Sequence, residues 1–134
     1  MNALELALYA RLTTFSALTT LLAGTASVYN QQAPTGAALP YVVFNLMAGG
    51  DDNDNPNRAL SLLYNVKAVG TAGFLNSGNI DTQIDAALHA QTLTVSGWAN
   101  IWTHRITNQR YVETVEGGRR YFHAGGQYRI RIAQ

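Results

Sequence analysis

The sequence of 134 residues contains no cysteine, only 3 prolines and few charged residues, which make up 13% of the chain. Without cysteine, disulfide bonds and thiolate metal sites are excluded. The 9 basic and 8 acidic residues leave a net charge of +1, so no strong field attracts nucleic acid or a membrane surface. Hydrophobic residues make up 47% of the chain. So little charge beside so much apolar side chain indicates that some surface is buried between subunits.

The first 28 residues are apolar enough to resemble a signal peptide. Glu5 stands where such a peptide has positive charge, and Arg11 interrupts the apolar run. We therefore expect a soluble protein made in the cytoplasm. Leucines at helical spacing predict instead an amphipathic helix from about residue 3 to residue 11 or 12. A second short helix should run through Leu22 and stop at Gly24.

The densest group of strand-favouring residues follows Pro40. Proline suits the entry of a strand, so the strand should begin near Tyr41. Because the run does not alternate between apolar and polar residues, we expect cover on both faces, by helices on one and partly by another copy of the chain on the other. We take four residues as its core anchors: Tyr41, Val42, Val43 and Phe44.

Residues 49–57 are almost free of apolar side chains and predict an exposed loop or arm at about 48–59. Its carboxylates do not match a calcium loop, because the loop glycine and the distal glutamate are missing. The segment Leu60–Val69 should then pair antiparallel with the preceding strand, with Leu62, Tyr64, Val66 and Ala68 on one face. We expect a helix at about residues 80–89, capped by Ser77 or Asn79. Asp81 and Asp85 should lie on its outer face, away from the apolar stripe.

The last third of the chain reads as strands and turns. Trp98 and Trp102 should share one strand face, either as core anchors or, if exposed, as an interface hot spot. Asn108–Gln109 looks like a tight connection, and Glu116–Arg119 like a hairpin turn. Gly125–Gly126 should break or bulge the strand before a final one at residues 128–132. Together these elements predict one α+β domain over residues 1–134, a mainly antiparallel sheet with two or three helices on one face.

Three segments lie in the order found in small tail proteins of long-tailed bacteriophages. They are Ala7–Leu12 near the N-terminus, Gly36–Phe44 at the central strand, and Tyr121–Ile130 near the end. Across nearly its whole length the sequence resembles the tail-completion or tail-terminator family. The resemblance implies an α+β subunit without enzymatic activity or cofactor. It also implies a ring, usually a hexamer, at the head-proximal end of the tail, in the virion.

Such a ring would stop tail-tube polymerisation, join the head connector and leave a hole through which DNA passes without specific binding. The implied partners are further copies of the chain, the tail tube protein and the head–tail connector or adaptor, with no membrane. Two alternatives stay open: a neck or head-completion adaptor of the same particle, and a small non-viral binding module.

Charged residues supply the candidate contact sites. Arginines are concentrated near the C-terminus, and we expect them to meet carboxylates of the next subunit, because bidentate pairing fixes register at an interface. The residues concerned are Asp51, Asp52, Asp54, Arg119, Arg120, Arg129 and Arg131. Two other interpretations of these arginines remain. They form a solvated strand face, or some of them face the axial hole of the ring beside the DNA.

The sequence offers no recognisable catalytic or metal-binding pattern. The histidines His89, His104 and His123 lack the spacing of a helical metal pair. Serine nucleophile elbows and phosphate-binding glycine loops are also missing. We therefore expect no catalytic residue, no metal site and no enzyme.

Overall fold

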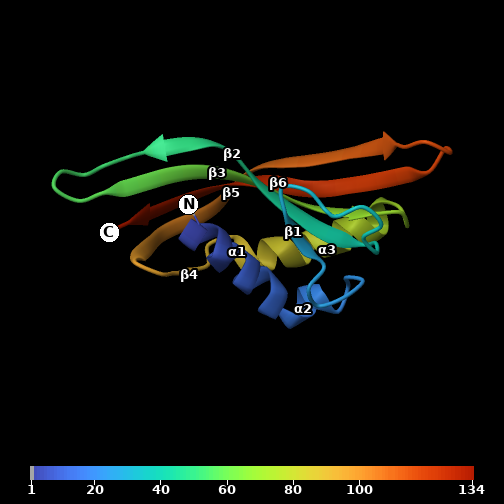
Figure 1. Cartoon of the computed structure of the whole chain (residues 1–134), viewed down its shortest axis with the longest axis horizontal. Helices are drawn as coiled ribbons and strands as arrows, with labels where there is room; N and C mark the ends of the chain where they lie inside the picture. Colours follow the sequence, from blue (N-terminus) through green and yellow to red (C-terminus); the bar gives the residue numbers. More distant parts are fainter. Residues whose placement is uncertain (1) are drawn as a thin grey trace.

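The computed structural model describes residues 2–134, in which three helices lie on one face of a six-stranded sheet (Figure 1). The strand order is β1-β2-β3-β6-β5-β4, with β1 parallel to β2 and every other pair antiparallel. This confirms the predicted α+β class. The elements are α1 (Asn2–Thr14), α2 (Ser16–Thr19), β1 (Val28–Asn30), β2 (Tyr41–Asp51), β3 (Ala59–Gly70), α3 (Phe74–Leu88), β4 (Thr94–Val95), β5 (Trp98–Thr114) and β6 (Arg120–Ala133).

The hydrophobic core lies between the helices and the middle of the sheet. Helix α1 contributes the leucine stripe recognised in the sequence, and α3 contributes isoleucines at the same spacing. Their partners are alternate residues of β3 and β6, as the period of two requires. The fully buried members include Leu4, Leu8, Leu12, Leu62, Tyr64, Val66, Ile80, Ile84, Tyr128 and Ile130, each 0% exposed. No helix within residues 2–134 is long and apolar enough to cross a membrane.

Strand β2 begins at Tyr41, directly after Pro40, as predicted. Val42 and Phe44 join the core beneath the helices, while Val43 points to the face that carries no helix. Val43 is nevertheless only 6% exposed. The structure therefore buries it within one chain, and the second copy that we expected to cover this face is not needed for this residue.

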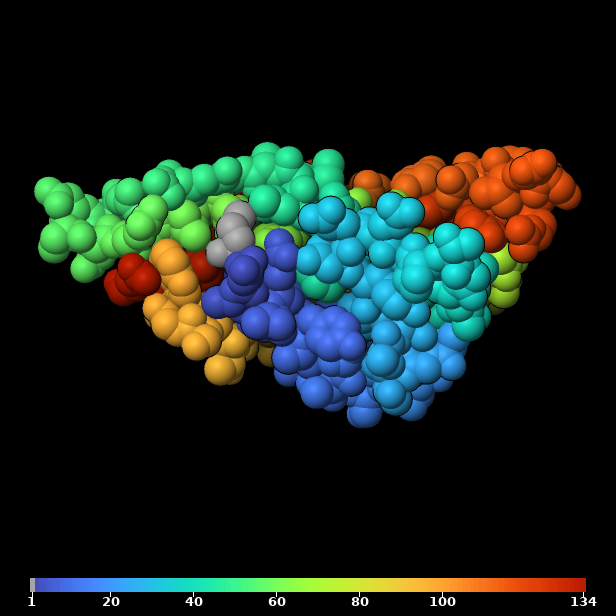
Figure 2. Space-filling view, viewed as in Figure 1, coloured from blue at the N-terminus to red at the C-terminus, as the bar shows by residue number. Residues whose placement is uncertain are grey.

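Two long hairpins extend in opposite directions beyond the helices (Figure 1). The β2–β3 hairpin turns through residues 52–58, and the β5–β6 hairpin turns through residues 115–119. In the space-filling view both hairpins project past the body formed by the N-terminal helices (Figure 2). Because β2 continues to Asp51, the exposed segment predicted at about 48–59 is partly strand. Residues 52–58, which connect the strands, are all exposed.

Several element boundaries differ from the sequence-based expectation. Helix α3 begins at Phe74, after Gly73 as its N-cap, so Ser77 lies inside the helix and does not cap it. Helix α2 stops at Thr19, and Gly24 is not among the glycines with positive φ. The polar residues and glycines near these segments predicted helix ends at other positions. Packing of the helices against the core sets the actual ends.

Strands β5 and β6 are also longer than predicted. Asn108 and Gln109 are not a connection but pair with Gly126 and Gly125 in the middle of the hairpin. The glycine pair does not break β6, which is paired on both sides. The bulges lie in β5 instead, at Ile101 and Ile106.

Candidate interaction surfaces

The acidic residues at the end of the β2–β3 hairpin contact an arginine of their own chain. Arg131 of β6 donates from Nε to Asp52 Oδ2 and from Nη2 to Asp54 Oδ2, both at 2.9 Å. Asp51 lies 3.9 Å from Arg58 in a pair that is exposed on both sides. The arginine–carboxylate pairing that we predicted between subunits is thus made within one subunit by Arg131. The hydrogen bonds to the two carboxylates raise the pKa of Arg131, so it stays charged.

The remaining candidate arginines lie elsewhere. Arg119 and Arg120 are exposed at the turn of the β5–β6 hairpin, at the opposite end of the molecule from Asp51. Arg129 lies on the helix-free face of β6, opposite His104 of β5 and Leu63 of β3. None of these three arginines forms an ion pair with another residue of the described chain. Their role between subunits stays a prediction.

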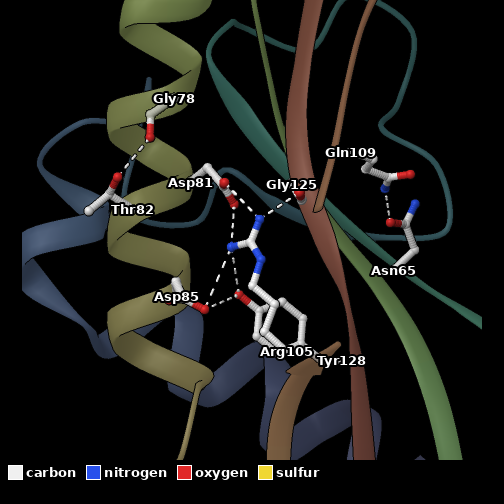
Figure 3. Close-up of polar contacts among 9 residues, drawn as sticks. All are labelled: Asn65, Gly78, Asp81, Thr82, Asp85, Arg105, Gln109, Gly125 and Tyr128. Carbon is white, nitrogen blue, oxygen red and sulfur yellow. Dashed lines mark hydrogen bonds and ion pairs between the residues drawn. The ribbon is translucent and has the colours of Figure 1, made fainter. Parts of the chain in front are cut away.

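A polar network that the sequence did not reveal joins α3 to the sheet (Figure 3). Arg105 of β5 donates from Nη1 to Asp81 Oδ1 at 3.0 Å and from Nη2 to Asp81 Oδ2 at 2.8 Å. Its Nη1 also lies 3.6 Å from Asp85, and the hydroxyl of Tyr128 donates to the same carboxylate at 3.1 Å. The Arg105 and Asp81 side chains are only 12% and 16% exposed. The signal in the sequence was two aspartates four residues apart on α3, which we had placed on the outer face of that helix.

Gly126 of β6 makes room for this network, while its neighbour Gly125 allows β3 to lie close and accepts a hydrogen bond from Arg105. A Cβ on Gly126 would collide with Arg105 Nε and with the carbonyl oxygen of Thr107, and a Cβ on Gly125 would collide with the backbone of β3. Arg105 Nη2 also donates to the Gly125 carbonyl at 2.6 Å. Burial raises the pKa of Tyr128, Arg105 acts in the opposite direction, and Asp85 raises it further. The tyrosine therefore remains a neutral donor, and the network is a structural link between α3 and the sheet.

A second polar cluster lies on the helix-free face near the β5–β6 hairpin. The ring of His123 stacks on Tyr111 with centroids 4.3 Å apart, and His123 Nε2 lies 2.9 Å from Glu113. Lys67 donates to the Tyr111 hydroxyl at 2.6 Å. Burial lowers the pKa of His123; the bond to Glu113 raises it and Lys67 lowers it further. Nδ1 of His123 is buried without a partner among the described residues.

The two tryptophans of β5 point to opposite faces, contrary to the prediction that they share one. The bulge at Ile101 adds a residue between Asn100 and Trp102, which reverses the alternation. Trp98 packs against the core, while Trp102 lies opposite Arg131 and beside His104, with ring centroids 5.4 Å apart. Trp98 thus lies against the hydrophobic core, whereas Trp102 lies on the helix-free face.

Two open clefts flank the core. One of about 480 Å³ lies beside the Arg105 network and is lined by polar groups that include Asp81, Asn108 and Arg110. The other, of about 380 Å³, lies beside α1 and is lined mainly by Leu6, Tyr9 and Phe44. Within residues 2–134, no group of three or more His, Cys, Asp or Glu side chains could hold a metal ion.

Apolar side chains are exposed along both projecting hairpins. Leu46 and Met47 of β2 are 37% and 50% exposed, and Tyr111 and Val112 of β5 are 42% and 44% exposed. Scattered apolar residues are normal on a monomer, and the most exposed ones, Leu75 and Leu6, lie on α3 and α1. The four residues named above are distinguished by their place along the outermost long strand of each hairpin. These surfaces, rather than a cleft with chemical groups, are the strongest candidates for function.

Comparison with known proteins gives a family and a fold. A family model described as "Tail completion protein gp17" matches residues 6–133. A solved chain from the "Virion of native gene transfer agent (GTA) particle" is similar with a TM-score of 0.80 at 19% identity, covering 99% of this chain and 96% of that one. A second solved structure, whose name is only a sequence identifier, has a TM-score of 0.65 at 16% identity, covering 99% and 94%. The curated protein sequences give no significant match.

Proposed function

Because the chain belongs to the tail completion protein gp17 family, and so is a structural protein of a bacteriophage tail, we propose that copies of it form the ring that ends the tail tube. The ring, a hexamer in this proposal, lies at the head-proximal end of the tail. It stops polymerisation of the tube protein, joins the head connector and leaves a hole through which DNA passes. The subunit is made in the host cytoplasm and has a structural role without catalysis.

The observation that carries the proposal is the family match over residues 6–133 of this chain. The shape of the subunit supports it, because two hairpins extend in opposite directions from one helical body (Figure 2). A head-to-tail contact between different surfaces generates a closed ring when the rotation between copies closes. Hairpins that leave opposite ends of a subunit provide two such different surfaces.

The experiment combines mass measurement with tube assembly. The molar mass of the purified protein is measured by light scattering, and the protein is then added to polymerising tail tube protein. We expect a ring-sized particle and tubes that stop growing with the ring at one end, as seen by negative-stain electron microscopy. Tubes that keep growing at the same rate in a molar excess of the chain would contradict the terminator role. A chain that binds only the head connector would identify a neck adaptor instead.

The charged contacts form a separate part of the proposal. Asp52 and Asp54 already bind Arg131, so replacing all three aspartates by lysine also breaks pairs within the subunit. Asp51→Lys is the cleaner variant, since its one ion pair within the described chain is the exposed contact with Arg58. We expect Asp51→Lys to weaken ring formation while the unfolding midpoint stays unchanged, with Leu75→Lys, at an 82% exposed position of α3, as the control. Unchanged assembly of both Asp51→Lys and the triple lysine variant would remove these aspartates from the interface.

A further inference from the structure

We propose that copies join by pairing sheet edges: residues 45–51 of β2 in one copy with residues 107–114 of β5 in the next. This inference deepens the proposed ring and depends on it. It assigns the contact mainly to the backbone and to apolar side chains. The four arginines proposed from the sequence, Arg119, Arg120, Arg129 and Arg131, are not part of it. The pairing would make one sheet that continues from copy to copy.

The edge of β2 is open along its second half. Strand β1 covers only the first part of β2, pairing Val28–Asn30 with Val42–Phe44. The Gln31 amide then donates to the Phe44 carbonyl, which closes this covered stretch. From Asn45 to Asp51, no described strand lies beside β2 on the side away from β3. Half of the hydrogen-bonding groups of this stretch therefore face outward.

The edge of β5 is open at the opposite end of the molecule. Strand β4 pairs only with Trp98 and Ala99. The connection after α3 covers the next part, because the Ala90 amide donates to the Thr103 carbonyl at 2.8 Å and the Arg105 amide donates to His89 Nδ1 at 3.0 Å. From residue 107 to residue 114, no described segment is paired with β5 on the side away from β6.

These two open edges have the geometry that a ring requires. They lie on opposite sides of the sheet, one on each projecting hairpin, and they are of nearly equal length (Figure 1). Because successive main strands alternate in direction, β2 and β5 run antiparallel within one copy. Copies related by rotation about a ring axis keep their orientation. The β5 edge of one copy therefore meets the β2 edge of the next as an antiparallel pair.

Two of the residues that commonly prevent such pairing are missing from both edges, whose charged side chains are Asp51 on β2 and Arg110 and Glu113 on β5. Monomeric proteins protect open edges with lysine and proline, and neither residue occurs in 45–51 or 107–114. The bulge at Met47 adds one residue to β2, and its side chain is 50% exposed. An open edge that is partly apolar and uninterrupted by such residues is suited to receive another strand.

The side chains select a register. Residues that face each other must point to the same side of the sheet, so Ala48 of the helix-free face requires a partner such as Tyr111 on that face. With Ala48 opposite Tyr111, the bulge at Met47 brings Leu46 opposite Val112 on the helix side. Leu46 and Val112 are 37% and 44% exposed in the single chain, and this register buries them against each other. It also places Arg110 diagonally from Asp51, so their charges are complementary.

Cysteine cross-linking tests the pairing directly, because the chain has no cysteine of its own. We would combine Ala48→Cys with Tyr111→Cys, and also with Gln109→Cys or Glu113→Cys to cover neighbouring registers. Within one copy, β3 and β6 separate the two strands by three strand spacings, about 14 Å, and Ala48 is level with His104 rather than with Tyr111, so the two positions are too far apart for a disulfide. The control pairs Ala48→Cys with Leu75→Cys, which is 82% exposed on α3.

We expect oxidation to give a ladder of covalent dimers and larger species up to the full ring, strongest for Ala48→Cys with Tyr111→Cys and absent from the control. Rings of normal mass that form no cross-link in any of the three double variants would overturn the edge pairing and leave the proposed ring intact. A chain that stays monomeric under all conditions would overturn both.

A charge exchange gives an independent test without oxidation. Leu46→Lys and Val112→Glu should each raise the concentration needed for half-assembly by about tenfold or more, and the double variant should recover most of this loss. Leu75→Lys is the matched control and should have no effect. Equal assembly of all four variants would contradict the register, and the unfolding midpoint of each variant checks that the subunit remains folded.

Discussion

Arg105 and Asp81 form a bidentate ion pair that joins strand β5 to helix α3, with Nη1–Oδ1 and Nη2–Oδ2 distances of 3.0 and 2.8 Å. Burial is the largest single influence on the pKa of Arg105 and would lower it, but the hydrogen bonds to Asp81, together with the charges of Asp81 and Asp85 and the nearby Tyr128, outweigh burial and raise the pKa. The guanidinium therefore stays charged beneath the sheet. The planar guanidinium fixes the position of α3 relative to β5 and β6, because both hydrogen bonds to Asp81 form only in one relative orientation.

Replacing Arg105 by alanine should destabilise the subunit by about 2–4 kcal/mol, because Asp81 then loses its partner in a poorly hydrated site. Urea unfolding followed by circular dichroism measures this change. The double variant Arg105→Met with Asp81→Leu should be more stable than the single one, since no unpaired charge remains. Arg119→Ala, on the exposed hairpin turn, serves as the control. A loss below about 0.5 kcal/mol for Arg105→Ala would show that the pair has no stabilising role.

Gly126→Ala should cost about 1–3 kcal/mol, because the added methyl group collides with Arg105 Nε and with the Thr107 carbonyl oxygen. Gly50→Ala is a matched control in another strand, since a Cβ there meets nothing within 4 Å. Its stability should change by only a few tenths of a kcal/mol. Equal unfolding midpoints for the two variants would mean that β5 can move away from β6 at little cost.

His123 should make the folded state less stable in acid. Its pKa is lowered in the folded chain, so the unfolded chain takes up the proton first. The contribution of neutral His123 is therefore fully present above the unfolded value of about 6.5, and it is lost as pH falls through the lower folded pKa. The NMR titration of the ring protons measures that pKa directly. His123→Gln should flatten the loss of stability between pH 7.5 and pH 5, compared with the unaltered chain.

The two tryptophans should differ in their effect on stability. Trp98→Ala removes a side chain packed against the core and should cost about 2–3 kcal/mol, whereas Trp102→Ala, on the helix-free face, should cost about 1 kcal/mol or less. Fluorescence of the two single-tryptophan variants should show a shorter emission wavelength for the one that retains Trp98. Equal costs and equal spectra would contradict the reversal of faces at Ile101.

Much of the fold could be predicted from residue patterns. The start of β2 followed from Pro40, and the helix-facing residues of β3 followed from their alternation, because these signals are local. The extension of β2 to Asp51 could not be predicted this way, since Gly49 and Gly50 are strand residues only because β3 pairs with them. The same holds for Asn108 and Gln109, whose strand conformation depends on the glycines of β6 opposite them.

The candidate site was predicted less well than the fold. The sequence predicted that Arg131 meets aspartates of the next subunit, but it could not show that Asp52 and Asp54 of the same chain reach it. The Arg105 network escaped notice because the partners are 24 residues apart and the aspartates looked solvated. The faces of Trp98 and Trp102 were assigned by simple alternation, which one extra residue at Ile101 defeats. Bulges depend on the partner strand, so a single strand read alone does not reveal them.

The helices support only the middle of the long strands, and this uneven support has a mechanical consequence. At either hairpin end, bending disturbs backbone bonds and exposed side chains but no core contact, so these ends are compliant while the centre is stiff. Amide protons near residues 52–58 and 115–119 should exchange with heavy water orders of magnitude faster than those of Val66 or Ile130. A subunit built in this way can adjust its extremities to a neighbour without any change in its interior.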